Sequence, residues 1–363
     1  MTVGIAMLAR NCASVIPDVL SPFKVDEIAI LLGGLSSDNT LGVAHNYADS
    51  VSQYIGPLDE SGGLLDFGLA RQQSFDLLTT DWVLLVDTDD VWSGADKLGE
   101  VINDAEGYQA VIFPYDLGGG VRFLQSRLFR RGTGHWSSPV HEEWIYHDPD
   151  KKTLTVNAMA VKQEKAGDKM PAVLRNIRIA EQHIEKNGFN YRLLMHLPHE
   201  YIITRQYDKA IEAVKQVLDR RAELKNELTT DKIFQLYYTL AMAHLCLEQY
   251  EIAVGAIMSA LRHEPRYGQG WTMLAEIAVQ MGVYDLAICA ADRALDRGKP
   301  VDGIPTPFAN ISSVPYYIKA KSLAGLGRKF EALSAVQLGL SLRDDKEMLN
   351  FKYQLCEELG VIP

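Results

Sequence analysis

The chain has 363 residues, of which 47% are hydrophobic and 23% charged, and its formal net charge is −11. This length exceeds one ordinary domain and predicts two, and the composition is that of a globular protein that can bury a core. Residues 1–165 carry the whole charge excess, with 12 lysines and arginines against 23 aspartates and glutamates. The excess disfavours general binding to nucleic-acid phosphates. It is compatible with a site that gathers a divalent cation, and equally with a charge that serves solubility.

Short apolar runs predict strands in the first part of the chain. In chain order these runs are Val3–Leu8, Glu27–Leu32, Trp82–Val86 and Ala110–Tyr115, with Arg122–Phe129 as a further strand. Helical stretches are expected between them, around residues 13–20, 40–47 and 64–78. Alternating strands and helices predict a Rossmann-like, mostly parallel sheet covered by helices on both faces. In such sheets ligands bind beyond the carboxyl ends of the strands.

Cysteine spacing and hydropathy predict a cytoplasmic setting. The four cysteines, at positions 12, 246, 289 and 356, show no paired spacing that would indicate a disulfide framework or a metal cage. The apolar run at the N-terminus predicts a buried strand rather than a signal peptide. No run approaches the roughly 20 apolar residues that a membrane span needs.

After about residue 165 the strand signal disappears and paired helices repeat. The segment around Ala210 recurs around Ala253 and Ala287, and more loosely around Ala332. Ala253 and Ala287 are 34 residues apart, which is the tetratricopeptide period. We therefore expect an α/β domain over 1–165 and an all-α, tetratricopeptide-like domain over 166–363, with a plain helical bundle as the alternative. Gly282 and Gly327 each precede a repeat alanine by five residues, where a small residue would let two helices approach closely.

The clearest strand runs directly into Asp87-Thr88-Asp89-Asp90. Carboxylate oxygens are the ligands that Mg²⁺ and Mn²⁺ prefer, and a rigid strand end fixes their geometry. A bound cation can neutralise the charge of a diphosphate leaving group. Asp89 is expected to bind the metal most directly, Asp87 to face the metal or a ribose, and Asp90 to help. The alternative is a solvated acidic turn.

Other segments accompany this motif in a fixed order: Leu8–Asn11, Val25–Thr40, Asp66–Arg71, Thr80–Asp90, Trp136 with Val140-His141-Glu142, and Arg175-Asn176. In this order they resemble family 2 glycosyltransferases of the GT-A type, in the subgroup that carries tetratricopeptide repeats. The resemblance covers nearly the whole chain.

The resemblance implies a metal-dependent transferase that moves a sugar from a nucleoside-diphosphate sugar to an acceptor, with inversion at the anomeric carbon. It implies Mn²⁺ or Mg²⁺ as cofactor and a uridine-diphosphate sugar as the default donor. Glu142 would be the catalytic base. The donor would be held by Asn11, Asp38, Arg71 and Asp87, and the metal by Asp87, Asp89 and His141.

Three features leave alternatives open. The family has a base-reading aspartate at the end of its second strand, where this chain has Leu32-Gly33-Gly34, so recognition of the nucleotide base is open. A basic cluster of Arg122, Arg127, Arg130 and Arg131 predicts either an anion site or a solvated strand edge. Trp136 and Trp144 could stack on a sugar or belong to the core, and Gly118–Gly120 is expected to be a loop or a lid.

The repeats predict partners. Repeat domains bind extended chains on a concave face, which favours a polymeric acceptor: a protein, a peptide, a glycan or a modified nucleobase in DNA. They could also drive self-association into a homo-oligomer. The competing hypothesis is a non-catalytic repeat scaffold with a degenerate transferase domain. A nucleotidyltransferase is disfavoured, because Arg10–Ala13 is not the Gly-rich basic loop that such an enzyme would need.

Overall fold

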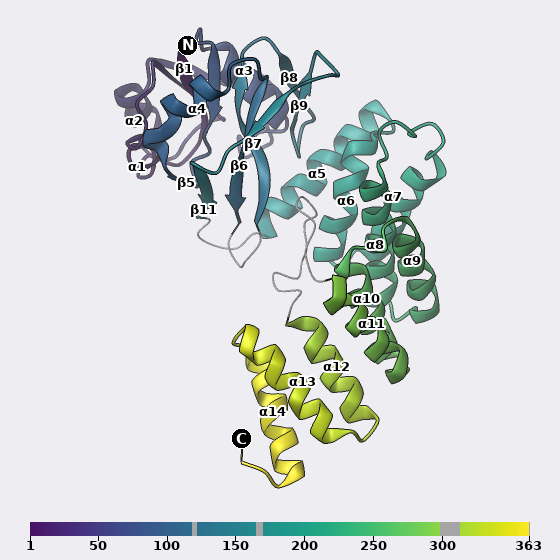
Figure 1. The fold of residues 1–363 in the computed structure, drawn as a ribbon. Coiled ribbons are helices and arrows are strands. Elements are labelled where there is room, and N and C mark those ends of the chain that lie inside the picture. The colour runs from purple at the N-terminus through teal and green to yellow at the C-terminus, as the bar shows by residue number, and fades with distance from the viewer. Residues whose placement is uncertain (118–121, 165–169, 298–312, 363) are drawn as a thin grey trace. The chain divides into compact units, whose positions relative to one another are not determined.

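A computed structural model describes residues 1–117, 122–164, 170–297 and 313–362 (Figure 1). The chain divides into two compact units, Met1–Leu193 and Leu194–Pro363. The division expected at residue 165 coincides with the end of the last strand, β11 (Ala160–Gln163), but helix α5 (Met170–Asn187) belongs to the first unit. Among the described residues, no helix has both the length and the apolar character to cross a membrane.

The first unit is built on a nine-stranded sheet in the order β3-β2-β1-β4-β7-β6-β11-β5, with β10 paired to β6. Its other strands are β1 (Val3–Ala9), β2 (Glu27–Leu32), β3 (Ser50–Gln53), β4 (Trp82–Leu85), β5 (Asp90–Ser93), β6 (Ala110–Asp116), β7 (Arg122–Arg130) and β10 (Thr153–Thr155). The five strands that the sequence predicted are therefore confirmed.

The sheet is mixed rather than mostly parallel. Strand β1 pairs in parallel with β2 and β4, and β2 pairs in parallel with β3. Strand β7, however, lies antiparallel between β4 and β6. Consecutive strands joined by a short connection pair as an antiparallel hairpin, whereas a parallel pair needs a long crossover. The parallel expectation is thus correct for the half around β1 and wrong for the half around β7.

Clusters of buried apolar side chains cover both faces of this sheet. On one face, α1 (Ile16–Leu20), α2 (Thr40–Tyr47) and α4 (Leu98–Asp104), which follows a 3₁₀ turn (Ala95–Lys97), pack against Ile5 and Met7 of β1. On the other face, α3 (Phe67–Asp76) and the hairpin of β8 (Gly134–Ser137) and β9 (Glu143–Tyr146) pack against Ala6. Because successive residues of a strand point to opposite faces, a strand buried on both faces reads as a continuous apolar run.

Trp136 and Trp144 belong to the cluster on the second of these faces. The ring centroid of Trp144 lies 5.1 Å from that of Phe129, and the centroid of Trp136 lies 5.6 Å from that of Phe75. Trp144 is 7% exposed. The two tryptophans therefore fill space between the hairpin and the sheet, as the alternative that assigned them to the core expects.

Helices make up most of the described residues after α5, and from α7 onward each packs against the next (Figure 1). They are α6 (Tyr191–Ile203), α7 (Tyr207–Asp219), α8 (Thr230–Cys246), α9 (Tyr250–His263), α10 (Gly268–Gln280), α11 (Tyr284–Arg297), α12 (Val314–Gly325), α13 (Lys329–Leu342) and α14 (Lys346–Leu359). The repeat alanines at 210, 253, 287 and 332 each occupy the fourth position of α7, α9, α11 or α13, and all four are 0% exposed. The predicted repeat thus corresponds to helix pairs that are closely packed at a small residue.

The residue five places before each repeat alanine lies in the left-handed backbone region. Its φ is 71° at Gly282 and 76° at Gly327, and also 60° at Arg205 and 58° at Glu248. At each turn the next N–H bonds back across the end of the preceding helix, as from Val283 N to the Ala278 carbonyl at 2.9 Å. Nothing lies within 4 Å of a Cβ built on either glycine. The expectation that these glycines let two helices approach closely is therefore wrong. Glycine is favoured at these positions because the turn requires a positive φ.

We expect Arg205→Gly and Glu248→Gly each to stabilise the protein by about 1 kcal/mol, because a side chain in the left-handed region costs roughly that much. Gly282→Ala should destabilise by a similar amount. Urea unfolding measures all three. Gly255→Ala is the matched control, because Gly255 lies within helix α9, where alanine should stabilise. If Arg205→Gly and Glu248→Gly both left the free energy of unfolding unchanged, this explanation would be contradicted.

Candidate functional site

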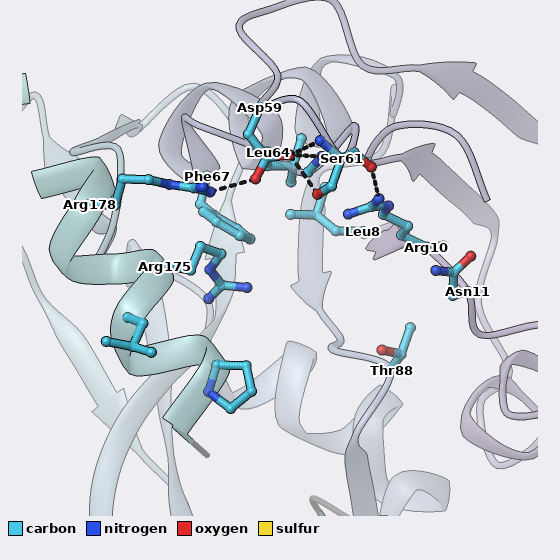
Figure 2. Close-up of a pocket in the computed structure, with 15 residues that line it drawn as sticks. Leu8, Arg10, Asn11, Asp59, Ser61, Leu64, Phe67, Thr88, Arg175 and Arg178 are labelled. Atoms are coloured by element: carbon cyan, nitrogen blue, oxygen red, sulfur yellow. Dashed lines mark hydrogen bonds and ion pairs between the residues drawn. The ribbon is translucent and has the colours of Figure 1, made fainter. Parts of the chain in front are cut away.

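Two adjoining pockets lie at the carboxyl ends of β1 and β4. The first pocket, of about 800 Å³, is bounded by the ends of β1 and β2, the loop around residues 59–64 and helix α5, and its lining includes Arg10, Asn11, Gly33, Asp59, Gly63, Leu64, Arg175 and Arg178 (Figure 2). The second pocket, of about 480 Å³, is lined among others by Arg71, Asp87, Asp89, Gln125, His141, Glu142 and Gln163. Leu8, Phe67, Thr88 and Arg175 line both, so the two pockets form one cleft.

The acidic motif places three carboxylates together just beyond β4. One oxygen from each of Asp87, Asp89 and Asp90 lies within 4.8 Å of the other two. Asp89 accepts a hydrogen bond from Gln163 Nε2 at 3.0 Å and lines the second pocket. Asp90 has a fully buried side chain and accepts from the Tyr115 hydroxyl at 2.8 Å. Burial raises the pKa of Asp90 to about 6. Asp90 therefore supports the site from beneath rather than facing the cleft.

Both oxygens of Asp87 accept from arginines. Arg71 Nη1 donates to Oδ1 at 3.0 Å, and Arg127 Nη1 donates to Oδ2 at 2.8 Å. Arg127 also lies 3.6 Å from Asp90 Oδ1 and has a side chain that is only 4% exposed. Burial raises the pKa of Asp87, but the two guanidinium groups outweigh it and hold that pKa well below its usual value. Asp87 is thus an ionised carboxylate fixed between two cations.

Glu142 reaches this network through Arg71, whose Nε donates to Glu142 Oε1 at 2.6 Å. Arg71 therefore bridges the two carboxylates. His141, with a φ of 52°, lines the second pocket but is not a member of the carboxylate cluster. The loop before β9 accordingly directs Glu142 into the site, 71 residues along the chain from its arginine partner.

The structure gathers most of the predicted site residues but not all. Arg71, Asp87, Asp89, His141 and Glu142 line the second pocket, and Asn11 lines the first. Asp38 is in neither lining; it accepts from the backbone N–H groups of Ala13 and Thr40, both at 3.0 Å. A carboxylate that closes its own loop in this way has its acceptor capacity used locally.

The predicted basic cluster does not form. Arg122 is exposed and pairs with Asp116 at 2.9 Å, whereas Arg127 is buried against Asp87. Arg131 donates to the Thr80 carbonyl, which precedes β4 and so lies at the opposite end of that strand from Asp87. A nine-residue strand spans about 30 Å and its side chains alternate between faces, so arginines that are neighbours in sequence are spread apart.

Sequence reasoning missed several residues that line the cleft. Gln163 follows the acidic cluster by more than 70 residues and reaches it because β11 pairs antiparallel with β5. Arg10 and Asp59 line the first pocket from separate loops. The Gly118–Gly120 loop lies outside the described residues.

No protein-family model and no curated protein matches the chain. Solved structures that are similar to part of it include a crystal structure of MamA, at 20% identity and a TM-score of 0.38, covering 53% of this chain and 98% of that one. A second is YrrB, a TPR protein with an unusual peptide-binding site, at 12% identity and a TM-score of 0.39, covering 51% and 86%. A third is a thermophilic TPR protein in Thermus thermophilus, at 17% identity and a TM-score of 0.38, covering 53% and 95%. The chain pairs a mixed-sheet unit with a region of helices that pack in succession.

Proposed function

We propose that the protein is a metal-dependent glycosyltransferase that uses a nucleoside-diphosphate sugar. The observation that carries the proposal is the convergence of Asp87, Asp89, Arg71 and Glu142 on one pocket at the carboxyl end of β4. We further propose that the first unit is a GT-A domain. The parallel strands β3-β2-β1-β4, with the acidic motif directly after β4, support this assignment.

The residues present suit a divalent cation. Carboxylate oxygens within 4.8 Å of one another are the donor set that Mn²⁺ and Mg²⁺ take. Asp89 is the proposed principal ligand, because its carboxylate lines the second pocket and belongs to the cluster of three carboxylates. A bound cation would supply Lewis-acid neutralisation of the diphosphate leaving group. Asp87 holds Arg71 and Arg127 in place and adds negative charge to the site.

Glu142 is the proposed general base. A base in an inverting transfer takes the proton from the acceptor hydroxyl as that oxygen attacks the anomeric carbon. Arg71 fixes the carboxylate of Glu142 in the pocket, since its Nε donates to Glu142 Oε1 at 2.6 Å. The sugar would therefore lie in the second pocket, and the nucleoside in the first. A polymeric acceptor, held by the repeats, completes the proposal.

Thermal unfolding with nucleoside diphosphates tests the donor site. We expect one nucleotide to raise the melting temperature only when Mn²⁺ is present. At a nucleotide concentration of 100 times its dissociation constant, the expected gain in the free energy of unfolding is about 2.7 kcal/mol. Asp89→Asn should remove this shift. Asp96→Asn is the control, because Asp96 is an exposed carboxylate outside the cleft. An equal shift in the two variants would contradict a metal site at Asp89.

A non-catalytic scaffold is the second candidate. The observation that favours it is the pairing of Asp87 and Glu142 with arginines, which leaves the charges of the site largely satisfied without a ligand. A scaffold of this kind would release no nucleotide from any sugar donor.

A further inference from the structure

Three charged side chains stand in a row along one wall of the first pocket. Figure 2 shows Asp59 between Arg178, from helix α5, and Arg10, from the end of β1. Arg178 Nη2 donates to Asp59 Oδ2 at 2.5 Å. The row therefore presents a donor, an acceptor and a second donor in sequence.

Loop contacts hold the middle of this row, Asp59, and one of its ends, Arg10, in place. Asp59 Oδ1 accepts from the N–H groups of Ser61 and Gly63, at 2.9 and 2.8 Å. Arg10 donates through Nε to the Leu35 carbonyl and through Nη2 to the Ser61 carbonyl. Among the described residues, Arg10 Nη1 has no hydrogen-bond partner in the protein. One arginine nitrogen thus remains available to a ligand.

Gly63 leaves open the space between the acceptor and this nitrogen. A Cβ built on Gly63 would lie 3.1 Å from Arg10 Nη1 and 3.1 Å from Asp59 Oδ2. Leu64 and Phe67 contribute apolar surface to the same pocket, and the guanidinium of Arg175 lies over the Phe67 ring, 4.6 Å from its centroid. The position therefore combines a fixed donor–acceptor pair, room for a ligand edge, and apolar walls.

Resting on the proposed function, we infer that Arg10, Asp59 and Arg178 read the base of the donor nucleotide and select a pyrimidine imide edge, that of uracil or thymine. That edge presents a carbonyl, an N–H and a second carbonyl, which complement a donor, an acceptor and a donor. Cytosine places a ring acceptor opposite Asp59, and guanine places an amino group opposite an arginine. Asp59 thereby takes the role left open at Gly33, where no side chain is available.

Calorimetric titration of the whole protein, with Mn²⁺ present, tests this inference with UDP, dTDP, CDP, GDP and ADP. We expect UDP or dTDP to bind at least about 10-fold more tightly than the other three, since hydrogen bonds to charged groups discriminate by this much. Asp59→Asn should weaken binding of the preferred nucleotide by about 10- to 100-fold. The ratio between the affinity for that nucleotide and the affinity for CDP should fall as well. The affinities for UDP and dTDP, compared with each other, show whether the site prefers uracil or thymine.

Asp49→Asn is the matched control, because Asp49 also accepts a backbone N–H, from Ile28 at 2.8 Å, and lies outside the pocket. If Asp59→Asn does not fold, Arg178→Ala replaces it, since that arginine is 48% exposed on α5; we expect weaker binding of the preferred nucleotide there too. Preference for CDP or a purine, or unchanged UDP affinity in a folded Asp59 variant, would overturn the inference while leaving the transferase standing. Binding of no nucleotide at all would remove both.

Discussion

Arg127→Met should destabilise the protein by about 3–5 kcal/mol, which is the cost of leaving a buried charge without its partner. The Arg127 side chain is 4% exposed and donates to Asp87 at 2.8 Å. It also lies 3.6 Å from Asp90, whose carboxylate is fully buried. Methionine preserves most of the volume but supplies no charge, so the loss measured by urea unfolding reports on the ion pairs.

Arg122→Met is the control on the same strand. Arg122 pairs with Asp116 at 2.9 Å, but its side chain is 79% exposed, and an exposed pair contributes about 0–1 kcal/mol. A cost at Arg127 as small as that at Arg122 would mean that the buried network around Asp87 is not formed in solution.

Glu142→Gln should lower the rate of sugar transfer to water, measured as the nucleoside diphosphate released, by about 10²- to 10⁴-fold, the usual contribution of a general base. Glutamine keeps the shape of the side chain and one oxygen for Arg71 Nε, which lies 2.6 Å from Glu142 Oε1. We therefore expect nucleotide binding to persist within about threefold, because the donor diphosphate does not depend on this base. Transfer and binding are measured on the same preparation.

Glu143→Gln is the neighbouring control. Its side chain is 57% exposed and pairs with Arg192 rather than with the cleft. Equal losses of turnover in the two variants would point to a disturbed loop instead of a lost base. Loss of binding in Glu142→Gln would place Glu142 in the donor site and contradict its role as the base.

The strands that the sequence predicted are those with a local signal. Strands β1, β2 and β4 are continuous apolar runs because both of their faces are buried. Strand β5 overlaps the acidic motif, and β11 has only four residues, so neither carries a hydrophobic period. Their pairing, Trp92 opposite Val161, is a long-range contact that no window of sequence contains.

In the candidate site, too, the sequence predicts what has a local signal and misses what depends on long-range pairing. The acidic motif and Glu142 were recognisable from a resemblance, but the clamp on Asp87 depends on strand order. Antiparallel pairing of β7 with β4 sets Leu128 opposite Leu84, which brings Arg127 toward Asp87. A prediction of a mostly parallel sheet cannot place Arg127 there.

In the repeat region, some features could be predicted from the sequence and others could not. The repeat alanines are visible in the sequence, and two of them, Ala253 and Ala287, are 34 residues apart, whereas Arg205 and Glu248 carry no sign of a positive φ. Helix α5 reads as part of the repeats by composition, yet its Arg175 and Arg178 line the first pocket. Helix α5 belongs to the first unit because of contacts with residues far away in the sequence, which its own composition does not reveal.

Nucleotide release from a panel of sugar nucleotides, with Mn²⁺ and with a chelator, tests the proposed transferase most directly. With water in place of the unidentified acceptor, we expect the wild-type protein to transfer the sugar of at least one uridine- or thymidine-diphosphate sugar to water and so release the nucleoside diphosphate. We expect the chelator to stop this release, and Glu142→Gln, which lacks the base that takes the proton of the attacking water, to slow it by about 10²- to 10⁴-fold. Nucleotide that binds with Mn²⁺ but is never released from any sugar donor would contradict the transferase and favour a scaffold that retains a nucleotide site.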